Sequence, residues 1–171
     1  MTIYKNPSKL INVGIIGELV KDDFVFSGFS ADNYLQLPDF FQPVLGDSWS
    51  ITVQFKTKSD FTSSNYLTIF DTTKTSTSGI TILIKNGKML YSIGNGSFYI
   101  DSAGTTAVAA NTTYLSRLTF NSTNLNYKFE LSTDNGATWA TDLEKTVTGK
   151  LVVNQMNPVI GKSFRVTSNN A

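Results

Sequence analysis

The sequence of 171 residues contains neither cysteine nor histidine. Without cysteine the chain has no disulfides, no thiolate nucleophile and no sulfur-bound zinc, although this absence does not fix a cellular compartment. Without histidine it lacks the central group of Ser-His-Asp and Cys-His catalysis and the imidazole that most often binds metals. These two absences exclude the catalytic and metal chemistries that depend on either side chain.

Strong charge of either sign is also missing. Lysine and arginine number 14 against 13 aspartates and glutamates, which gives a net charge of +1, and neither half has a basic run. We therefore expect no nucleic-acid partner. We expect no membrane insertion either, because no apolar run approaches the length that a bilayer requires. Residues 1–7 lack the basic and apolar segments of a signal peptide, so export would need another route, such as release within a virus particle.

Alternation of apolar and polar residues is the dominant pattern. In the stretch 49–56 every second residue, beginning with Trp49, is apolar and the others are polar. The stretch 124–131 repeats the pattern, with apolar residues at Leu125, Tyr127, Phe129 and Leu131. A period of two residues is typical of half-buried strands in antiparallel sheets.

Shorter segments of the same type occur at the spacing of a β-sandwich. These predicted strands are 24–29, 34–37, 66–70, 80–85, 89–93, 98–101 and 113–120. Asn86-Gly87 and Asp134-Asn135-Gly136 tolerate positive φ and predict hairpin turns. We expect polar loops at 71–79 and from 101 through Gly104, and little helix, because no stretch has helical periodicity.

The sequence predicts one sandwich domain over 24–171, preceded by an N-terminal segment 1–23. Residues 10–16 form an apolar patch within that segment. It could be an edge strand, an oligomerisation arm or a connector to another part of an assembly, and we favour a first strand.

The order of these segments resembles a known family. The segments that carry this resemblance are 26–30 (FSGFS), 34–38 (YLQLP), 47–55 (DSWSITVQF), 79–88 (GITILIKNGK), 111–120 (NTTYLSRLTF), 131–139 (LSTDNGATW) and 157–161 (NPVIG). Together they resemble laminin-G-like domains of the concanavalin A-like lectin and glucanase superfamily, particularly those in bacteriophage tail and receptor-binding proteins. The resemblance implies an all-β jelly-roll sandwich of two antiparallel sheets that binds glycan or protein.

The sequence departs from that family at its end. Family members usually continue with one more strand beside the first, whereas this sequence stops before it. The chain is therefore expected to be a fragment, or to replace that strand with its N-terminal segment or a neighbouring subunit, because an unpaired edge invites association.

Catalysis is not expected, and no catalytic residue is assigned. The resemblance to this superfamily implies a test for catalysis, because its glucanases carry a Glu-x-Asp-x-x-Glu pattern. Their retaining mechanism needs two carboxylates about 5 Å apart. The only glutamates are Glu18, Glu130 and Glu144, and none has that neighbourhood. The nearest imitation is Asp142-x-Glu144, whose spacing would place both carboxylates on one strand face. We interpret that pair as a solvated strand end.

Sugar binding needs an aromatic platform beside side chains that both donate and accept hydrogen bonds. In the segment 91–99, Tyr91, Asn95 and Tyr99 could reach a ligand from a glycine-rich turn, or the aromatics could pack across strands. Trp139, which follows the turn at 134–136, could stand at the rim as a stacking surface or pack half-buried. We assign Tyr91, Asn95, Tyr99 and Trp139 as candidate ligand-binding residues.

Two further residues and two loops have alternative interpretations. Trp49 is in phase with the apolar face of its strand and is expected in the core. Arg117 lies on the polar face of its strand and is interpreted as a solvated or paired surface residue. The loops 121–124 and 134–135 offer oxygen ligands for Ca²⁺, but neither matches a defined calcium loop, so the turn interpretation is favoured and no metal or cofactor is assigned.

The leading hypothesis is a non-catalytic domain of a phage tail or fibre protein that recognises cell-surface carbohydrate, in the virion or otherwise outside the cell. The alternative is a structural virion module that contacts other virion proteins without binding sugar. Self-association, for example as a trimer, is compatible with both.

Overall fold

The computed structural model describes residues 35–36, 48–61, 67–73, 77–95, 99–148 and 159–161. Ten strands account for the regular structure of this part of the chain, which contains no helix. They are β1 (Leu35–Gln36), β2 (Trp49–Lys56), β3 (Leu67–Asp71), β4 (Ser78–Lys85), β5 (Lys88–Asn95), β6 (Tyr99–Ala107), β7 (Thr113–Asn121), β8 (Asn126–Ser132), β9 (Ala140–Thr146) and β10 (Val159–Ile160).

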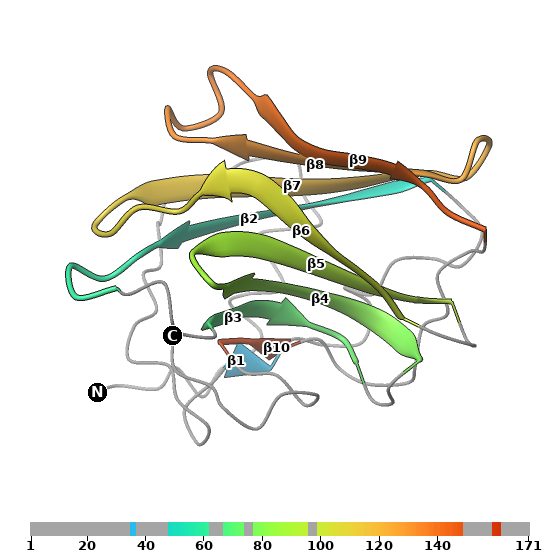
Figure 1. Ribbon diagram of the computed structural model, residues 1–171, viewed down its shortest axis with the longest axis horizontal. Coiled ribbons are helices and arrows are strands. Elements are labelled where there is room, and N and C mark those ends of the chain that lie inside the picture. Colours follow the sequence, from blue (N-terminus) through green and yellow to red (C-terminus); the bar gives the residue numbers. More distant parts are fainter. Residues whose placement is uncertain are drawn as a thin grey trace, which may run out of the picture.

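The strands form two antiparallel sheets that pack face to face (Figure 1). The six-stranded sheet has the order β1-β10-β3-β4-β5-β6, and the four-stranded sheet has the order β2-β7-β8-β9. Every strand pair is antiparallel. None of the described residues belongs to a helix long and apolar enough to cross a membrane.

The core lies between the sheets because alternate side chains of each strand point inward. Ile82 of β4 lies opposite Tyr91 of β5, and Leu118 of β7 lies opposite Phe129 of β8. All four side chains are at most 2% exposed. Aromatic contacts extend this core to its margin, where the ring of Trp49 packs at 5.8 Å from Phe120.

Turn chemistry closes the hairpins as expected. Lys85 and Lys88 are paired, so the β4–β5 loop consists of Asn86 and Gly87 alone, with φ of 52° and 70°. Two successive residues with positive φ are the signature of a type I′ hairpin turn. Asn135 and Gly136, with φ of 58° and 86°, lie in the turn between β8 and β9.

Three predicted boundaries were wrong. The loop expected from 101 through Gly104 belongs to β6, which continues to Ala107. The strand expected from 124 begins at Asn126, because Leu125 has a φ of 53° and belongs to the preceding turn. The polar loop predicted at 71–79 is shorter, since Asp71 ends β3 and β4 begins at Ser78. The predicted segments 1–23 and 24–29 lie outside the described residues.

Candidate ligand-binding surface

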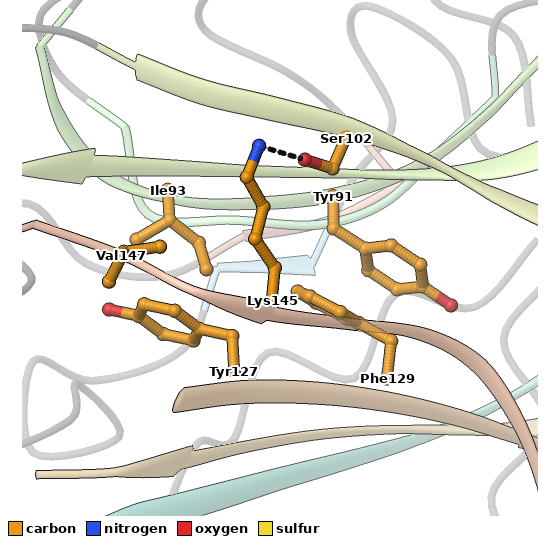
Figure 2. Close-up of a pocket in the computed structure, with 7 residues that line it drawn as sticks. All are labelled: Tyr91, Ile93, Ser102, Tyr127, Phe129, Lys145 and Val147. Atoms are coloured by element: carbon orange, nitrogen blue, oxygen red, sulfur yellow. Dashed lines mark hydrogen bonds between the residues drawn. The ribbon is translucent and has the colours of Figure 1, made fainter. Parts of the chain in front are cut away.

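The pocket drawn in Figure 2 lies between the sheets and is too small for a sugar. Its free volume is about 10 Å³, which is the space of about one water molecule. Aromatic side chains of both sheets line it, and Lys145 reaches across it to donate a hydrogen bond to Ser102 Oγ at 3.3 Å. A ligand of saccharide size is therefore not accommodated there, and a sugar would have to bind on an open surface.

Tyr91 lies in the core and does not reach the surface. Its side chain is 1% exposed, its ring centroid is 3.7 Å from that of Phe129, and its hydroxyl donates a hydrogen bond to Asp142 Oδ2 at 3.4 Å. Desolvation raises the pKa of Tyr91 far above its usual value. The prediction that Tyr91 contacts a ligand was therefore wrong, because its position in β5 faces the opposite sheet.

Asn95 and Tyr99 lie far from Trp139 along the sandwich. Tyr99 begins β6 and pairs with Gly94, so Asn95 and Tyr99 share one end of the β5–β6 hairpin. Their side chains lie outside the described part of the structure. Thr105, near the other end of β6, contacts Asp142 of β9, and Trp139 immediately precedes β9. The four candidate residues therefore do not form one site.

Trp139 is half-buried at the turn between β8 and β9. The Arg117 guanidinium carbon lies 4.0 Å from the centroid of its ring, which is cation–π geometry. A Cβ added to Gly136 would lie 3.6 Å from Cζ2 of Trp139 and 3.3 Å from Cδ1 of Leu115, so this turn packs closely along the ring edge. Because Arg117 covers one face and Gly136 lies at an edge, we assign the exposed part of the ring to its other side.

Arg117 is held in place by Glu130, its neighbour across the β7–β8 pair. Arg117 Nη2 and Nε lie 2.7 and 2.9 Å from Glu130 Oε2, and Lys128 Nζ lies 2.9 Å from Oε1. Burial opposes ionisation of Glu130, but the hydrogen bonds from Lys128 and Arg117 outweigh it and lower the pKa of this carboxyl below its usual value. One largely buried carboxylate thus binds two cations, and the three side chains together keep a net charge of +1.

The turn beside Trp139 is fixed by Asp134. Its Oδ1 accepts hydrogen bonds from Ser132 Oγ at 2.7 Å and from the Thr138 amide at 2.9 Å, while Oδ2 accepts from Thr138 Oγ1 at 2.6 Å. These bonds, those from Thr138 first, lower the pKa of Asp134 to about 2. Gln54 of β2 donates to Asn135 Oδ1 at 3.4 Å, which joins the turn to the edge strand.

We refer to Trp139, Arg117, Gln54 and Asn135 as the Trp139 surface. Gln54 and Asn135 are exposed, and each carries an amide that can donate and accept hydrogen bonds. The sequence indicated Trp139 as a candidate, and of the two alternatives that it left open for Arg117, solvated or paired, the structure shows the paired one. The sequence did not bring in Gln54, Asn135 or Glu130. Counting back from the predicted 121–124 turn would have set Arg117 opposite Lys128, because the turn lies one residue further along the chain in the structure.

The two loops that offer oxygen ligands for Ca²⁺ use these oxygens for hydrogen bonds within their own turns. Asn121 Oδ1 accepts from the Thr123 amide at 2.9 Å, and Asn124 Oδ1 accepts from the Asn126 amide at 3.2 Å. The carboxylate of Asp134 is engaged as described above. Within the part of the chain that the structure describes, no group of three or more acidic, histidine or cysteine side chains could hold a metal ion.

Asp142 and Glu144 do not share a strand face. Phe129 pairs with Leu143 and Glu130 with Thr141, so Asp142 is the additional residue of a β-bulge. Asp142 is 2% exposed and points toward β6, whereas Glu144 is exposed. The predicted same-face geometry and the solvated position of Asp142 were both wrong, because a one-residue bulge reverses the alternation.

Comparison with known proteins shows the fold. No protein-family model matches this sequence, and no curated protein matches it. A solved structure of the CBM40 of the Ruminococcus gnavus IT-sialidase, bound to α2,3-sialyllactose, has a TM-score of 0.54 at 16% identity, over 72% of this chain and 68% of that one. Domains LG4-5 of the mouse laminin α1 chain give 0.59 at 13% identity, over 84% and 36%.

The binding domain of botulinum neurotoxin serotype D is similar as well, with a TM-score of 0.56 at 17% identity, over 78% of this chain and 33% of that domain. The chain thus spans about a third of the laminin and toxin structures. At these identities the similarity is one of fold, and it confirms the predicted all-β jelly-roll sandwich of two antiparallel sheets.

Proposed function

We propose that this chain is a non-catalytic domain that binds carbohydrate through the Trp139 surface. The observation that carries the proposal is the half-buried Trp139 ring, backed on one face by Arg117 at 4.0 Å. A sugar ring presents apolar C–H groups that stack on an indole, and its hydroxyls both donate and accept hydrogen bonds. Gln54 and Asn135 supply amides of that kind beside the ring.

Rigidity supports this assignment. Asp134 fixes the turn through three hydrogen bonds, and Glu130 fixes Arg117 through two. A platform that is already ordered loses little conformational entropy when it binds. The similar fold of a module solved with sialyllactose bound is a further support, since it shows that such a sandwich can present a sugar site.

The biological setting that we propose is recognition of a cell-surface glycan by a phage tail or fibre protein, in the virion or otherwise outside the cell. This part of the proposal rests on the order of sequence segments that resembles laminin-G-like domains of phage receptor-binding proteins. Its test is binding of the purified chain to bacterial surface polysaccharides and to whole bacterial cells.

A glycan array probed with the purified chain and with Trp139→Ala tests the site itself. Loss of the indole is expected to weaken binding about tenfold or more, because aromatic contacts contribute roughly 1 kcal/mol beyond their buried area. Lys88→Ala is the matched control, since Lys88 is exposed on the other sheet. A folded Trp139→Ala variant that binds like the unmodified chain would refute the proposed site.

A second candidate function, a structural module in an assembly, is favoured by one observation. The inward-facing side chains of β2 are only half-buried, whereas those of β7 are buried. A neighbouring subunit or another virion protein that pairs with this strand would complete their burial. Light scattering separates the candidates, because a stable trimer or larger oligomer without glycan binding supports the structural role.

A further inference from the structure

We propose that the Trp139 surface selects neutral sugars over sugars that carry a carboxylate. This inference rests on the proposed function, and it concerns the chemical class of the ligand. It runs opposite to what the sialyllactose complex of the similar module suggests by analogy, because the charges of this chain are arranged differently from those of an anion site.

The cation nearest the indole is already engaged. Both Nη2 and Nε of Arg117 contact Glu130 Oε2, and the guanidinium carbon lies 4.0 Å from the Trp139 ring centroid. A sugar carboxylate that bound Arg117 would have to displace Glu130 or share the guanidinium with it. A ligand carboxylate that displaced Glu130 would exchange one ion pair for another, so its own loss of hydration would not be matched by a net gain of ion pairs.

Displacing Glu130 is itself unfavourable. The Glu130 side chain is 9% exposed, so it would not regain full hydration on losing Arg117. Lys128 would remain as its only ion-pair partner among the described residues, at 2.9 Å. Removing one partner of a largely buried charge is strongly destabilising, whereas a neutral ligand leaves both ion pairs intact.

Apart from Lys56, the carboxylates around Trp139 outnumber the cations, because Asp134 and Glu144 add to the Glu130 carboxylate that binds Arg117 and Lys128. Asp134 is exposed at the turn beside the indole and is ionised at neutral pH, because its hydrogen bonds favour the charged form. Glu144 is exposed on the same side of the four-stranded sheet, opposite Lys128 in the register. Both carboxylates repel a sugar acid.

Lys56 is an exposed cation on the same face of β2, two residues beyond Gln54. At the rise of an extended strand this is a separation of roughly 7 Å. A sugar acid on the Trp139 surface could reach Lys56 from the Gln54 side without displacing Glu130, so Lys56→Ala reports that route separately.

The experiment measures binding of glycan pairs of which one member is acidic. Galactose oligomers and galacturonic acid oligomers differ only by the carboxylate at C6 of each residue, and 3′-sialyllactose differs from lactose by an added sialic acid residue. We expect the neutral member of each bound pair to bind about tenfold or more tightly than the acidic one. Neutral binding should also change little between about 0.05 and about 0.5 M salt, since no ion pair with the ligand is formed.

Glu130→Gln is the decisive variant. It removes the charge that occupies Arg117 and Lys128 while keeping the shape of the side chain, so the acidic member of each pair should gain affinity relative to the neutral one. Glu144→Gln makes the same charge change on the same face without releasing Arg117. It removes only the repulsion by Glu144, so it should shift the ratio clearly less than Glu130→Gln does. Thermal unfolding followed by circular dichroism establishes that both variants are folded.

The outcomes are distinguishable. Acidic members that bind as tightly as neutral ones, or a ratio that changes equally in the two variants, would overturn the selectivity while leaving carbohydrate binding intact. A Lys56→Ala variant that alone abolishes acidic binding would place any anion contact at Lys56 and leave the inference for the Trp139 surface standing. Absence of binding to either class would refute the proposed function and this inference together.

Discussion

The carboxylate of Asp142 accepts a hydrogen bond from the backbone amide of Thr106 at 2.7 Å and thereby joins β9 to β6, the edge strands of the two sheets. The same Oδ1 accepts from the Thr105 amide at 2.9 Å, and Thr105 Oγ1 donates to the Asp142 carbonyl oxygen at 3.2 Å. One bulged residue thus closes one side of the sandwich.

Asp142→Ala is therefore expected to lower the free energy of unfolding by roughly 2–5 kcal/mol, because it leaves two backbone donors without their acceptor. Glu144→Ala, two residues further along β9 and exposed, should change it by less than about 0.5 kcal/mol. Urea denaturation of both variants measures the difference. Equal stability of the two variants would show that Asp142 does not hold the edge.

Gly104→Ala tests the same contact from the opposite strand. A Cβ at this position would overlap the carboxylate of Asp142, so the two strands approach this closely only because residue 104 has no side chain. We expect a loss of roughly 1–3 kcal/mol from the overpacking. A double-mutant cycle supplies the control, since Gly104→Ala should cost clearly less in a chain that already carries Asp142→Ala. Additive effects would contradict the proposed overlap.

The alternation of apolar and polar residues was sufficient to predict the strands that bury only one face. The stretch 49–56 coincides with β2, because its apolar residues match the period of a pleated strand. The burial of Tyr91 could also have been predicted from the sequence, since Tyr91 alternates in phase with Met89 and Ile93, which are both buried. The expected ligand contact was based on the glycines near Tyr91 and not on this alternation of buried residues.

The remainder depends on contacts between distant segments. Residues 102–106 are small and polar and resemble a loop, yet they form a strand because Asp142 supplies a partner for their amides. The bulge at Asp142 is likewise set by that contact and not by its neighbours in sequence. At the candidate site, Trp139 was visible as an aromatic beside a turn, whereas its contact with Arg117 requires the register of β7 and β8.

The geometry of the turn between β4 and β5 allows the effect of one added methyl group on stability to be predicted. Gly87 has a φ of 70°, a conformation that residues with a Cβ adopt only with strain. Gly87→Ala should therefore lower the free energy of unfolding by more than about 1 kcal/mol. Asn86→Gly, at a φ of 52°, keeps a residue that tolerates this conformation and should change stability by only a few tenths of a kcal/mol. Chemical denaturation of both variants provides the comparison, and similar losses would argue against strain at Gly87.

Acid should weaken the turn that supports Trp139. The pKa of Asp134 falls from 3.8 to about 2 in the folded chain, chiefly because Thr138 donates hydrogen bonds to the charged carboxylate. A group whose folded pKa is depressed stabilises the fold above its unfolded pKa, and this contribution is lost as the pH falls from about 4 to about 2. Glu130, whose pKa is also lowered, acts in the same direction.

An NMR titration of the Asp134 carboxyl carbon measures this shift directly. Thr138→Ala removes the hydroxyl that donates to Oδ2 at 2.6 Å, so the pKa of Asp134 should rise toward its usual value. Thr141→Ala, at an exposed position of β9, is the control and should leave the titration unchanged. Because Asp134 also orders the turn beside the indole, Thr138→Ala should weaken glycan binding at neutral pH in parallel. A normal titration of Asp134 in the unmodified chain would contradict the hydrogen-bonded turn on which the Trp139 surface depends.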